Sequence, residues 1–250
     1  MLLAKYSASG NDFVIFHSFV KKNRCKLAQQ LCDRQDGIGA DGLIVLVPNK
    51  DEDFEWEFYN SDGSSAEMCG NGSRAAAHYA YKYGLASAKM SFVTLAGVIK
   101  AEVEGDMVQS DLTPPIIENT DIHVNSKRWW LVNTGVPHLI TFDANIDEFD
   151  LQEARSLRET HNANVNIAAV LDDGSLRVRT YERGVEDETL ACGTGMAAAY
   201  YRAIKDGLTT GRVKVFPRSG ETLYLGFNDK TITFRGAVKD VFEAAWNETA

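Results

Sequence analysis

The sequence lacks the features that mark several large classes of protein. It contains no run of about 18 apolar residues, so no segment is expected to span a membrane. Its N-terminus has neither the charged start nor the apolar stretch of a signal peptide, which favours a reducing, cytoplasmic location. The net charge of −9 leaves no basic excess with which to bind a nucleic-acid backbone.

Motifs for metal and dinucleotide binding are missing as well. The chain has four cysteines but no Cys-x2-Cys pair and no cluster of histidines, so no metal site is expected. Gly70-Asn71-Gly72 and Gly193-Thr194-Gly195 both lack the further glycine of the signature Gly-x-Gly-x-x-Gly. The composition, 44% hydrophobic and 24% charged, is that of an ordinary soluble protein. The length of 250 residues is enough for one large domain or two smaller ones.

Two short segments of the chain are nearly alike. Residues 68–72 read Met-Cys-Gly-Asn-Gly, residues 191–195 read Ala-Cys-Gly-Thr-Gly, and an alanine-rich run follows each. A cysteine at the start of a helix lies beside backbone N–H groups and the positive end of the helix dipole, which favour a thiolate. Cys69 and Cys192 are therefore predicted to be paired reactive thiols. The alternative, two cysteines that only pack in the core, does not explain why the flanking residues also agree.

The repeat extends beyond the cysteines. Gly10 precedes Cys69 by 59 positions and Gly135 precedes Cys192 by 57. An apolar stretch that ends in an aromatic and a polar residue comes before each cysteine, at residues 58–60 and 180–182. We interpret the chain as two homologous α/β domains, residues 1–114 and 115–237, divided near two consecutive prolines that disfavour strand pairing. Residues 238–250 are a candidate for a segment that completes the first domain.

Few helices and many strands are expected. The helices are predicted at residues 25–34, 72–83, 151–160 and 195–205, with Gly84 and Gly207 as C-caps. Strands are predicted at residues 43–47, 54–59, 91–94, 99–103, 107–111, 131–132, 139–142, 167–171, 176–181, 213–216, 223–227 and 231–234. The helices after the two cysteines carry few charges, so each is expected to be enclosed by strands of its own domain. Asn71 and Thr194 are preferred N-cap residues and are expected to cap these helices.

This pattern suggests a chemistry. The N-terminus of a helix binds anions, including a carboxylate. If the two helix starts shared one carboxylate, a thiolate could remove the proton from its α-carbon while the opposite thiol returned a proton to the other face. The product would carry the inverted stereocentre, and the reaction would need no cofactor.

The residues around Cys69 resemble those of a known family. Asn60-Ser61-Asp62-Gly63-Ser64, followed after four residues by Cys69-Gly70-Asn71-Gly72-Ser73-Arg74, is similar to the active-site signature of diaminopimelate epimerases. The resemblance runs nearly end to end, through residues 10–13, 37–42, 135–138, 164–166, 181–184 and 188–195. It implies an α/β (α+β) fold with two pseudo-symmetric domains, each a central helix wrapped by mainly antiparallel β-structure. It also implies a cofactor-independent enzyme, a candidate homodimer, that interconverts LL- and meso-diaminopimelate for lysine and peptidoglycan-precursor synthesis.

The resemblance also implies roles for individual residues. Cys69 and Cys192 would be the acid and base, and His138 would orient a thiol or the substrate. The implied substrate-binding residues are Asn11, Asn60, Gly70, Asn71, Asn164, Glu182, Arg183, Gly193 and Thr194. Each residue also has a structural alternative. Asn11 and Asn60 could be turn residues, Glu182 and Arg183 could be solvated surface charges, and His138 could form a hydrogen bond to a backbone group.

The chain departs from the family pattern in four places. Ser7-Ala8 replaces a frequent His-Gly, Gly42 and Val136 stand where many members carry a substrate-facing amide, and the loop 183–188 is one residue longer. Other functions therefore stay open: a two-cysteine racemase of proline or hydroxyproline, a cysteine hydrolase that pairs Cys69 or Cys192 with His138, and a silent binding module.

Overall fold

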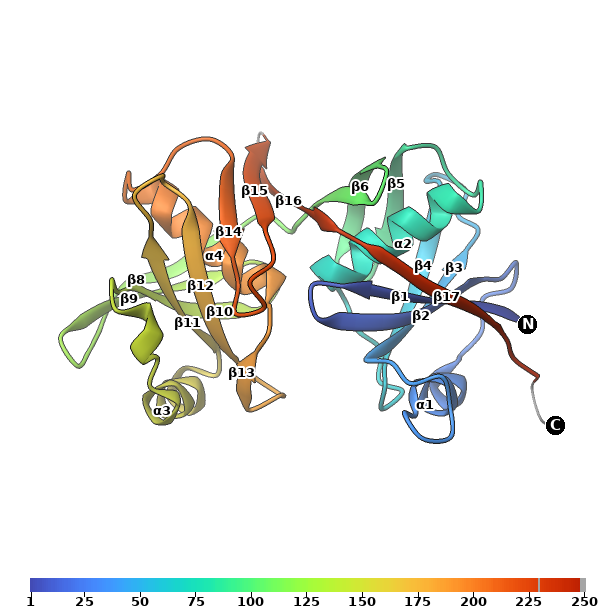
Figure 1. Cartoon of the computed structure of the whole chain (residues 1–250), viewed down its shortest axis with the longest axis horizontal. Coiled ribbons are helices and arrows are strands. Elements are labelled where there is room, and N and C mark those ends of the chain that lie inside the picture. The colour runs from blue at the N-terminus through green and yellow to red at the C-terminus, as the bar shows by residue number, and fades with distance from the viewer. Residues whose placement is uncertain (229, 248–250) are drawn as a thin grey trace. The chain divides into compact units, whose positions relative to one another are not determined.

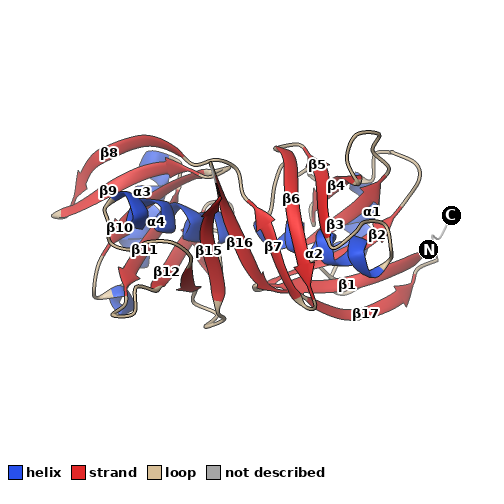
Figure 2. Cartoon of the chain, turned by 90° about the horizontal axis from the view of Figure 1, so that it is seen from above, coloured by secondary structure: helices blue, strands red, loops and turns tan. Residues whose placement is uncertain are grey.

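The structure is a computed structural model that describes residues 1–228 and 230–247. The chain forms two compact units: unit 1 combines residues 1–110 with the segment that begins at Gly236, and unit 2 is residues 111–235. Both units are α/β, with a few helices among many strands (Figures 1 and 2). The fold class expected from the sequence is thus confirmed.

Unit 1 contains two helices and the strands at both ends of the chain. Its elements are β1 (Leu2–Ala8), β2 (Asn11–His17), α1 (Cys25–Cys32), β3 (Gly42–Val47), β4 (Phe54–Asn60), α2 (Gly70–Lys82), β5 (Lys89–Thr94), β6 (Gly97–Glu104), β7 (Met107–Asp111) and β17 (Lys239–Ala245). The last strand, β17, pairs antiparallel with β1, from Leu2 opposite Ala245 to Ser7 opposite Lys239. Of the segment 238–250 that was expected to complete this half, residues 248–250 lie outside the described residues.

Unit 2 has a similar order of elements, with η1 and β13 in addition. It contains β8 (Ile116–Val124), β9 (Lys127–Asn133), β10 (Pro137–Phe142), the 3-10 helix η1 (Ile146–Glu148), α3 (Leu151–His161), β11 (Asn164–Val170), β12 (Leu176–Glu182), β13 (Asp187–Thr189), α4 (Gly193–Lys205), β14 (Val213–Phe216), β15 (Leu223–Asn228) and β16 (Thr231–Ala237).

The pairing of the strands shows the duplication directly. In unit 1, β2 and β3 pair in parallel, β3 and β4 antiparallel, and β4 and β5 in parallel. In unit 2, β10 and β11 pair in parallel, β11 and β12 antiparallel, and β12 and β14 in parallel. The helices α2 and α4 occupy the same place in the two series. The internal repeat read from the sequence is therefore a repeat of structure.

Each unit encloses one of these helices. Ala75–Ala77 in α2 and Ala197–Ala199 in α4 are completely buried. The helix α2 contacts β1, β2, β3 and β6, whereas α4 contacts β9 to β12. Alanine suits this position because its small side chain lets strands approach a helix closely on several sides. The expectation of an enclosed helix is confirmed in both units.

The starts of these helices differ from the prediction in one respect. Cys69 and Cys192, with extended backbones, are the N-cap residues, and Asn71 and Thr194 lie inside the first turn. The prediction that Asn71 and Thr194 cap the helices was wrong, because the helices begin at the glycines just after the cysteines. At the other ends, Gly84 and Gly207 follow the last turn with φ of +68° and +70°, as a C-terminal glycine does.

Several strands were not predicted from the sequence, because they are exposed or very short. The side chains of β8 are mostly exposed, so its sequence lacks the apolar alternation by which strands are recognised. The strand β13 is only three residues long. No helix among the described residues is long and apolar enough to cross a membrane.

Candidate active site

In unit 1 the site is built on the first turn of α2. The Sγ atom of Cys69 accepts a hydrogen bond from the backbone N–H of Gly72 at 3.4 Å, which holds the sulfur over the N-terminal end of the helix. Gly70 and Asn71 are buried beside it. The sulfur therefore lies where the N–H groups and the dipole of the helix stabilise negative charge.

Asn71 connects this turn to the loop between β1 and β2. Its Nδ2 donates to Oδ1 of Asn11 at 2.8 Å, and its Oδ1 accepts from the guanidinium of Arg74 at 2.7 Å. Arg74 is fully buried and also donates to the hydroxyl of Ser9. Both the Nδ2 and the Oδ1 of Asn71 thus form hydrogen bonds within the protein, and Asn71 holds the side chain of Asn11 in place. The sequence reasoning missed Arg74, whose signal was its place at the end of the signature.

Charged groups brace the same loop. The carboxylate of Asp12 accepts from Arg34 at 2.9 Å and from Lys5 at 2.7 Å. Burial alone would raise the pKa of Asp12, but these hydrogen bonds outweigh it and hold the pKa at about 2. Asn60 is the last residue of β4, and its Nδ2 donates to the hydroxyl of Ser64.

In unit 2 a chain of side chains leads to the second cysteine. The Sγ of Cys192 lies 3.5 Å from Oγ1 of Thr194, and that hydroxyl lies 2.9 Å from Nε2 of His138. On the other side of the imidazole, Nδ1 lies 3.1 Å from Nδ2 of Asn166. Asn166 was quoted in the sequence only as part of a motif, and its role in orienting His138 was not predicted.

The direction of these hydrogen bonds follows from the chemistry of their ends. The Nδ2 of Asn166 also donates to the carbonyl of Leu139 at 3.2 Å, and a carbonyl can only accept, so the amide orientation is fixed. Hence Nδ1 of His138 accepts, Nε2 carries the proton, and the Thr194 hydroxyl receives it. The hydroxyl proton of Thr194 is then available to Cys192. This order requires a neutral imidazole, and burial lowers the pKa of His138 to about 3.

Of the four remaining predicted residues, Gly193 is the buried first residue of α4 and Asn164 lies against this chain. The Oδ1 of Asn164 accepts from the backbone N–H of Arg183 at 2.7 Å, so its Nδ2 is a donor. This Nδ2 lies 3.5 Å from the protonated Nε2 of His138, and the two donors share no hydrogen bond. The guanidinium of Arg183 donates to the carbonyl of Asn162 at 2.9 Å. Burial raises the pKa of Glu182. The structure thus brings Cys192, Thr194, His138 and Asn164 together, and Glu182, the last residue of β12, directly precedes Arg183.

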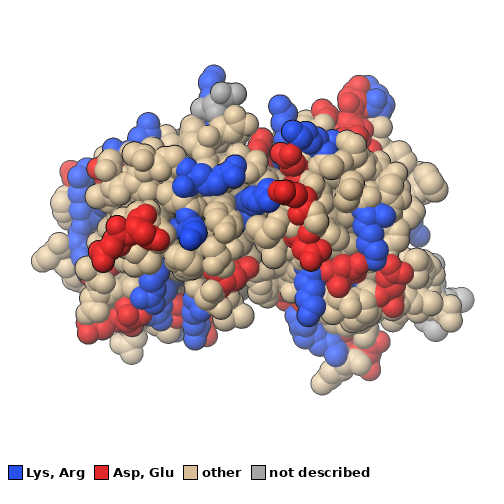
Figure 3. Space-filling view, turned by 45° about the horizontal axis from the view of Figure 1, so that its top comes forward, with Lys and Arg blue, Asp and Glu red and all other residues tan. Residues whose placement is uncertain are grey.

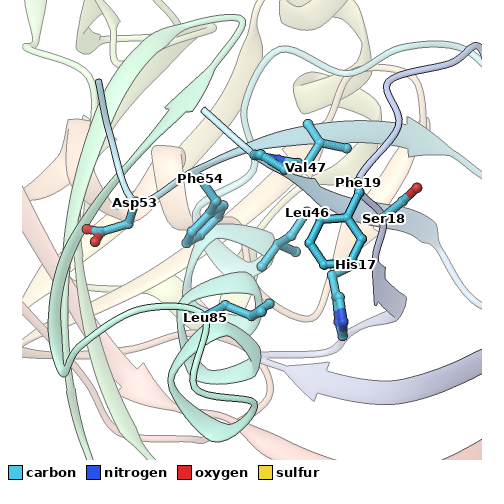
Figure 4. Close-up of a pocket in the computed structure, with 9 residues that line it drawn as sticks. His17, Ser18, Phe19, Leu46, Val47, Asp53, Phe54 and Leu85 are labelled. Carbon is cyan, nitrogen blue, oxygen red and sulfur yellow. The ribbon is translucent and has the colours of Figure 1, made fainter. Parts of the chain in front are cut away.

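Other surface features are unrelated to these residues. An apolar hollow of about 130 Å³ in unit 1 is lined by residues that include His17, Phe19, Phe54 and Leu85, and by none of the predicted site residues (Figure 4). Acidic and basic side chains are interspersed over the face drawn in Figure 3. Among the described residues no group of three or more His, Cys, Asp or Glu side chains is arranged to hold a metal ion.

Comparison with solved structures identifies the class of fold. The chain superposes on a probable proline racemase from Agrobacterium radiobacter K84 with a TM-score of 0.79, over 99% of this chain and 93% of that one, at 14% sequence identity. The two cysteines at helix starts therefore sit in a two-unit α/β fold that is also found in a protein described as a racemase.

Sequence comparison identifies the family within that class. The model for diaminopimelate epimerase matches residues 3–117 and 130–238, and the chain belongs to this family. It is 61% identical to the diaminopimelate epimerase of a Nitratiruptor species over 97% of both chains. It is 52% identical to that of Campylobacter jejuni subsp. jejuni (strain 81-176) over 99% of both. The resemblance stated from the signature residues is confirmed.

Proposed function

We propose that this chain interconverts LL- and meso-diaminopimelate by moving one proton at an α-carbon, without a cofactor. The observation that carries the proposal is the repeated placement of a cysteine at the start of an enclosed helix, Cys69 in unit 1 and Cys192 in unit 2. Full-length relatives described as diaminopimelate epimerases support the choice of substrate.

In the proposed reaction one cysteine acts as base and the other as acid. A thiolate removes the α-proton, and the thiol of the second cysteine delivers a proton to the opposite face of the planar carbanion. Both sulfurs are supported for ionisation by a helix N-terminus. In unit 2 the Thr194 hydroxyl, polarised by neutral His138, supplies a further hydrogen bond to the thiolate form of Cys192.

The proposed contacts to substrate use both backbone and side-chain groups. The N–H groups after Gly70 and Gly193 are suited to the carboxylate at the reacting carbon, because helix starts bind anions. Glu182 is suited to an ammonium group and Arg183 to the distal carboxylate. Asn11, Asn60 and Asn164 are proposed to complete the recognition, with Asn71 holding Asn11 in place.

The proposal is tested by incubating the protein with LL-diaminopimelate in deuterated water. We expect meso-diaminopimelate to form with one deuterium at the inverted α-carbon, and we expect Cys69→Ala and Cys192→Ala each to abolish the conversion. A cysteine hydrolase would tolerate the loss of one of the two cysteines and would form a trappable acyl-thiol intermediate. Conversion of proline, with no reaction of diaminopimelate, would overturn the assignment.

Two coarser expectations accompany this proposal. We propose that the enzyme works in the reducing cytoplasm, because its mechanism needs both thiols reduced. We also propose a homodimer, which the family resemblance implies. Sedimentation or light scattering should give about twice the chain mass of 27.6 kDa, and a mass equal to one chain would contradict the dimer.

A further inference from the structure

A cavity in unit 2 gathers three arginines that the proposed reaction does not use. Its volume is about 390 Å³, and its lining includes Arg177, Arg179 and Arg218, together with Asp147. Arg177 and Arg179 are two residues apart on β12, so their side chains project from the same face of the strand. Arg218 comes from the loop between β14 and β15. The even-numbered residues Leu176 and Thr180 point to the other face and are buried.

The charges around this cavity do not balance. Arg179 makes two hydrogen bonds to the buried carboxylate of Glu188, at 2.6 and 2.7 Å, which neutralise it. Arg177 pairs with Asp147 at 2.8 Å, and the side chain of Asp147 is 75% exposed. The guanidinium of Arg218 lies 3.5 Å from the same Glu188 carboxylate, which Arg179 already binds. Three guanidinium groups thus face two carboxylates, so one positive charge has no matching negative charge within this group.

The geometry favours a bound anion over a closed salt-bridge network. A guanidinium carries five N–H donors. Glu188 is buried and held by Arg179, whereas the side chains of Arg177 and Arg218 are 41% and 49% exposed. Both can therefore present donors to a ligand. The cavity is large enough for a small molecule rather than a lone ion, because small-molecule sites begin at about 300 Å³.

We propose that this cavity binds a small polyanion through a terminal phosphate or carboxylate group held between Arg177 and Arg218. Arg179 lines the cavity as well, and it keeps its hydrogen bonds to the buried Glu188 when the ligand binds. Arginine suits both kinds of anionic group, because its planar fork matches their oxygens in pairs. The proposal does not depend on the proposed function.

The site is linked by hydrogen bonds to the segment that leads into Cys192. Arg218 donates to the backbone carbonyl of Glu188 at 3.2 Å. The neighbouring Ser219 donates its N–H to the carbonyl of Leu190 at 2.9 Å. Leu190 lies two residues before Cys192. A ligand that immobilises the loop of Arg218 should therefore also restrict this segment, and we include this coupling in the proposal.

Binding is tested by calorimetry on the full chain at about 0.15 M salt, where unspecific attraction is screened. The probes are pyrophosphate and citrate, which separate a phosphate source from a carboxylate source. We expect one site per chain, with affinity reduced about tenfold or more in Arg177→Gln and in Arg218→Gln, as for loss of a charge-assisted hydrogen bond. Arg177→Lys and Arg218→Lys keep the positive charge but lose the planar guanidinium, so these variants should retain only part of the wild-type affinity.

Arg155→Gln is the matched control, because Arg155 is an exposed arginine of the same unit that pairs with Glu159 on its own helix and does not line the cavity. An equal loss of affinity in this variant would reduce the effect to net charge and would overturn the site. Binding of neither probe would overturn it as well.

The coupling is tested by the rate at which iodoacetamide alkylates each cysteine, measured by peptide mass spectrometry. We expect saturating ligand to slow the alkylation of Cys192 and to leave Cys69, in the other unit, unchanged. Unchanged rates at both cysteines would overturn the coupling, and slowing at both would assign the effect to binding at the cysteines themselves instead of at this cavity.

Discussion

The hydroxyl of Thr194 has one proton, and the structure directs it toward Cys192, because the imidazole of His138 donates to the same oxygen. Replacing Thr194 by Val removes this donor while keeping the shape of the side chain. A hydrogen bond to a charged group contributes about 1.5–3 kcal/mol. We therefore expect the alkylation rate of Cys192 at pH 7 to fall by about tenfold or more, since the thiolate is the reacting form.

The matched variant Thr194→Ser keeps the hydroxyl and should keep most of the rate. Cys69, in the same sample, serves as the internal reference. Equal rates in the Val and Ser variants would mean that the hydroxyl does not act on the sulfur.

His138 should leave a signature in the pH dependence of stability. Its pKa in the folded chain is lowered from 6.5 to about 3, so between these values the unfolded chain takes up a proton that the folded chain does not. The free energy of unfolding should therefore fall as the pH falls from about 6.5, by up to about 1.4 kcal/mol per pH unit. Urea unfolding of the wild type and His138→Gln between pH 4 and 7 measures this.

In His138→Gln this part of the slope should be absent, so the difference in stability between the two proteins should change with pH. Groups such as Glu182, which titrate in both proteins, cancel in this comparison. Two parallel curves would contradict a buried neutral His138.

For single residues, the sequence predicted which positions belong to the candidate site. It did not predict which contacts their side chains make. The two cysteines, Asn71 and His138 could be found from the repeat and the signature. The sequence could not predict that Asn71 holds Asn11, because that contact joins atoms 60 positions apart in the chain. The substrate roles of the predicted residues stay predictions.

The equivalent glycines of α2 and α4 pack differently against their strands. A Cβ added at Gly195 would lie 2.3 Å from Oδ1 of Asn166, whose amide holds His138. A Cβ added at Gly72 would meet the end of the Ile44 side chain at 3.2 Å, and this flexible group can move. We expect Gly195→Ala to destabilise the protein by about 1–3 kcal/mol.

Gly72→Ala should be close to neutral, because alanine gains about 0.8–1 kcal/mol of helix propensity over glycine. The midpoints of chemical unfolding of the two variants test this order. A greater loss for Gly72→Ala would show that the close approach of α4 to β11 is not the limiting contact.

The elements themselves were predicted to different degrees. The four helices were found to within two residues at most ends, because apolar periodicity and terminal glycines mark them. The start of α4 was placed two residues late, because a cysteine in the N-cap position leaves no polar capping signal. The pairing of β17 with β1 joins opposite ends of the chain, and no local pattern specifies such a partner.

On the scale of the whole molecule, unit 1 depends on the last strand of the chain. Beyond its ladder with β1, β17 is held by ion pairs from Lys82 to Asp240 and to Glu243, the latter at 2.8 Å. Deleting the chain from Lys239 onward should expose the edge of β1. Hydrogen exchange should then show lost protection in β1 and β2, with β10 and β11 of unit 2 unchanged.

The double variant Asp240→Asn with Glu243→Gln is the milder control, because it removes the ion pairs and keeps the strand. It should cost less protection than the deletion, since exposed ion pairs contribute little. Unchanged protection of β1 in the deleted chain would contradict a stabilising role for this strand.

The return of the chain to β1 also has a consequence for biosynthesis. A ribosome delivers the chain from its N-terminus, and domains that emerge first usually fold first. Here all of unit 2 leaves the ribosome before β17 does, so the later half of the gene product can be finished while the earlier half still waits for its outermost strand. During that interval β1 carries unpaired backbone groups, which other nascent chains could join. Completion of unit 1 thus has to follow the synthesis of unit 2.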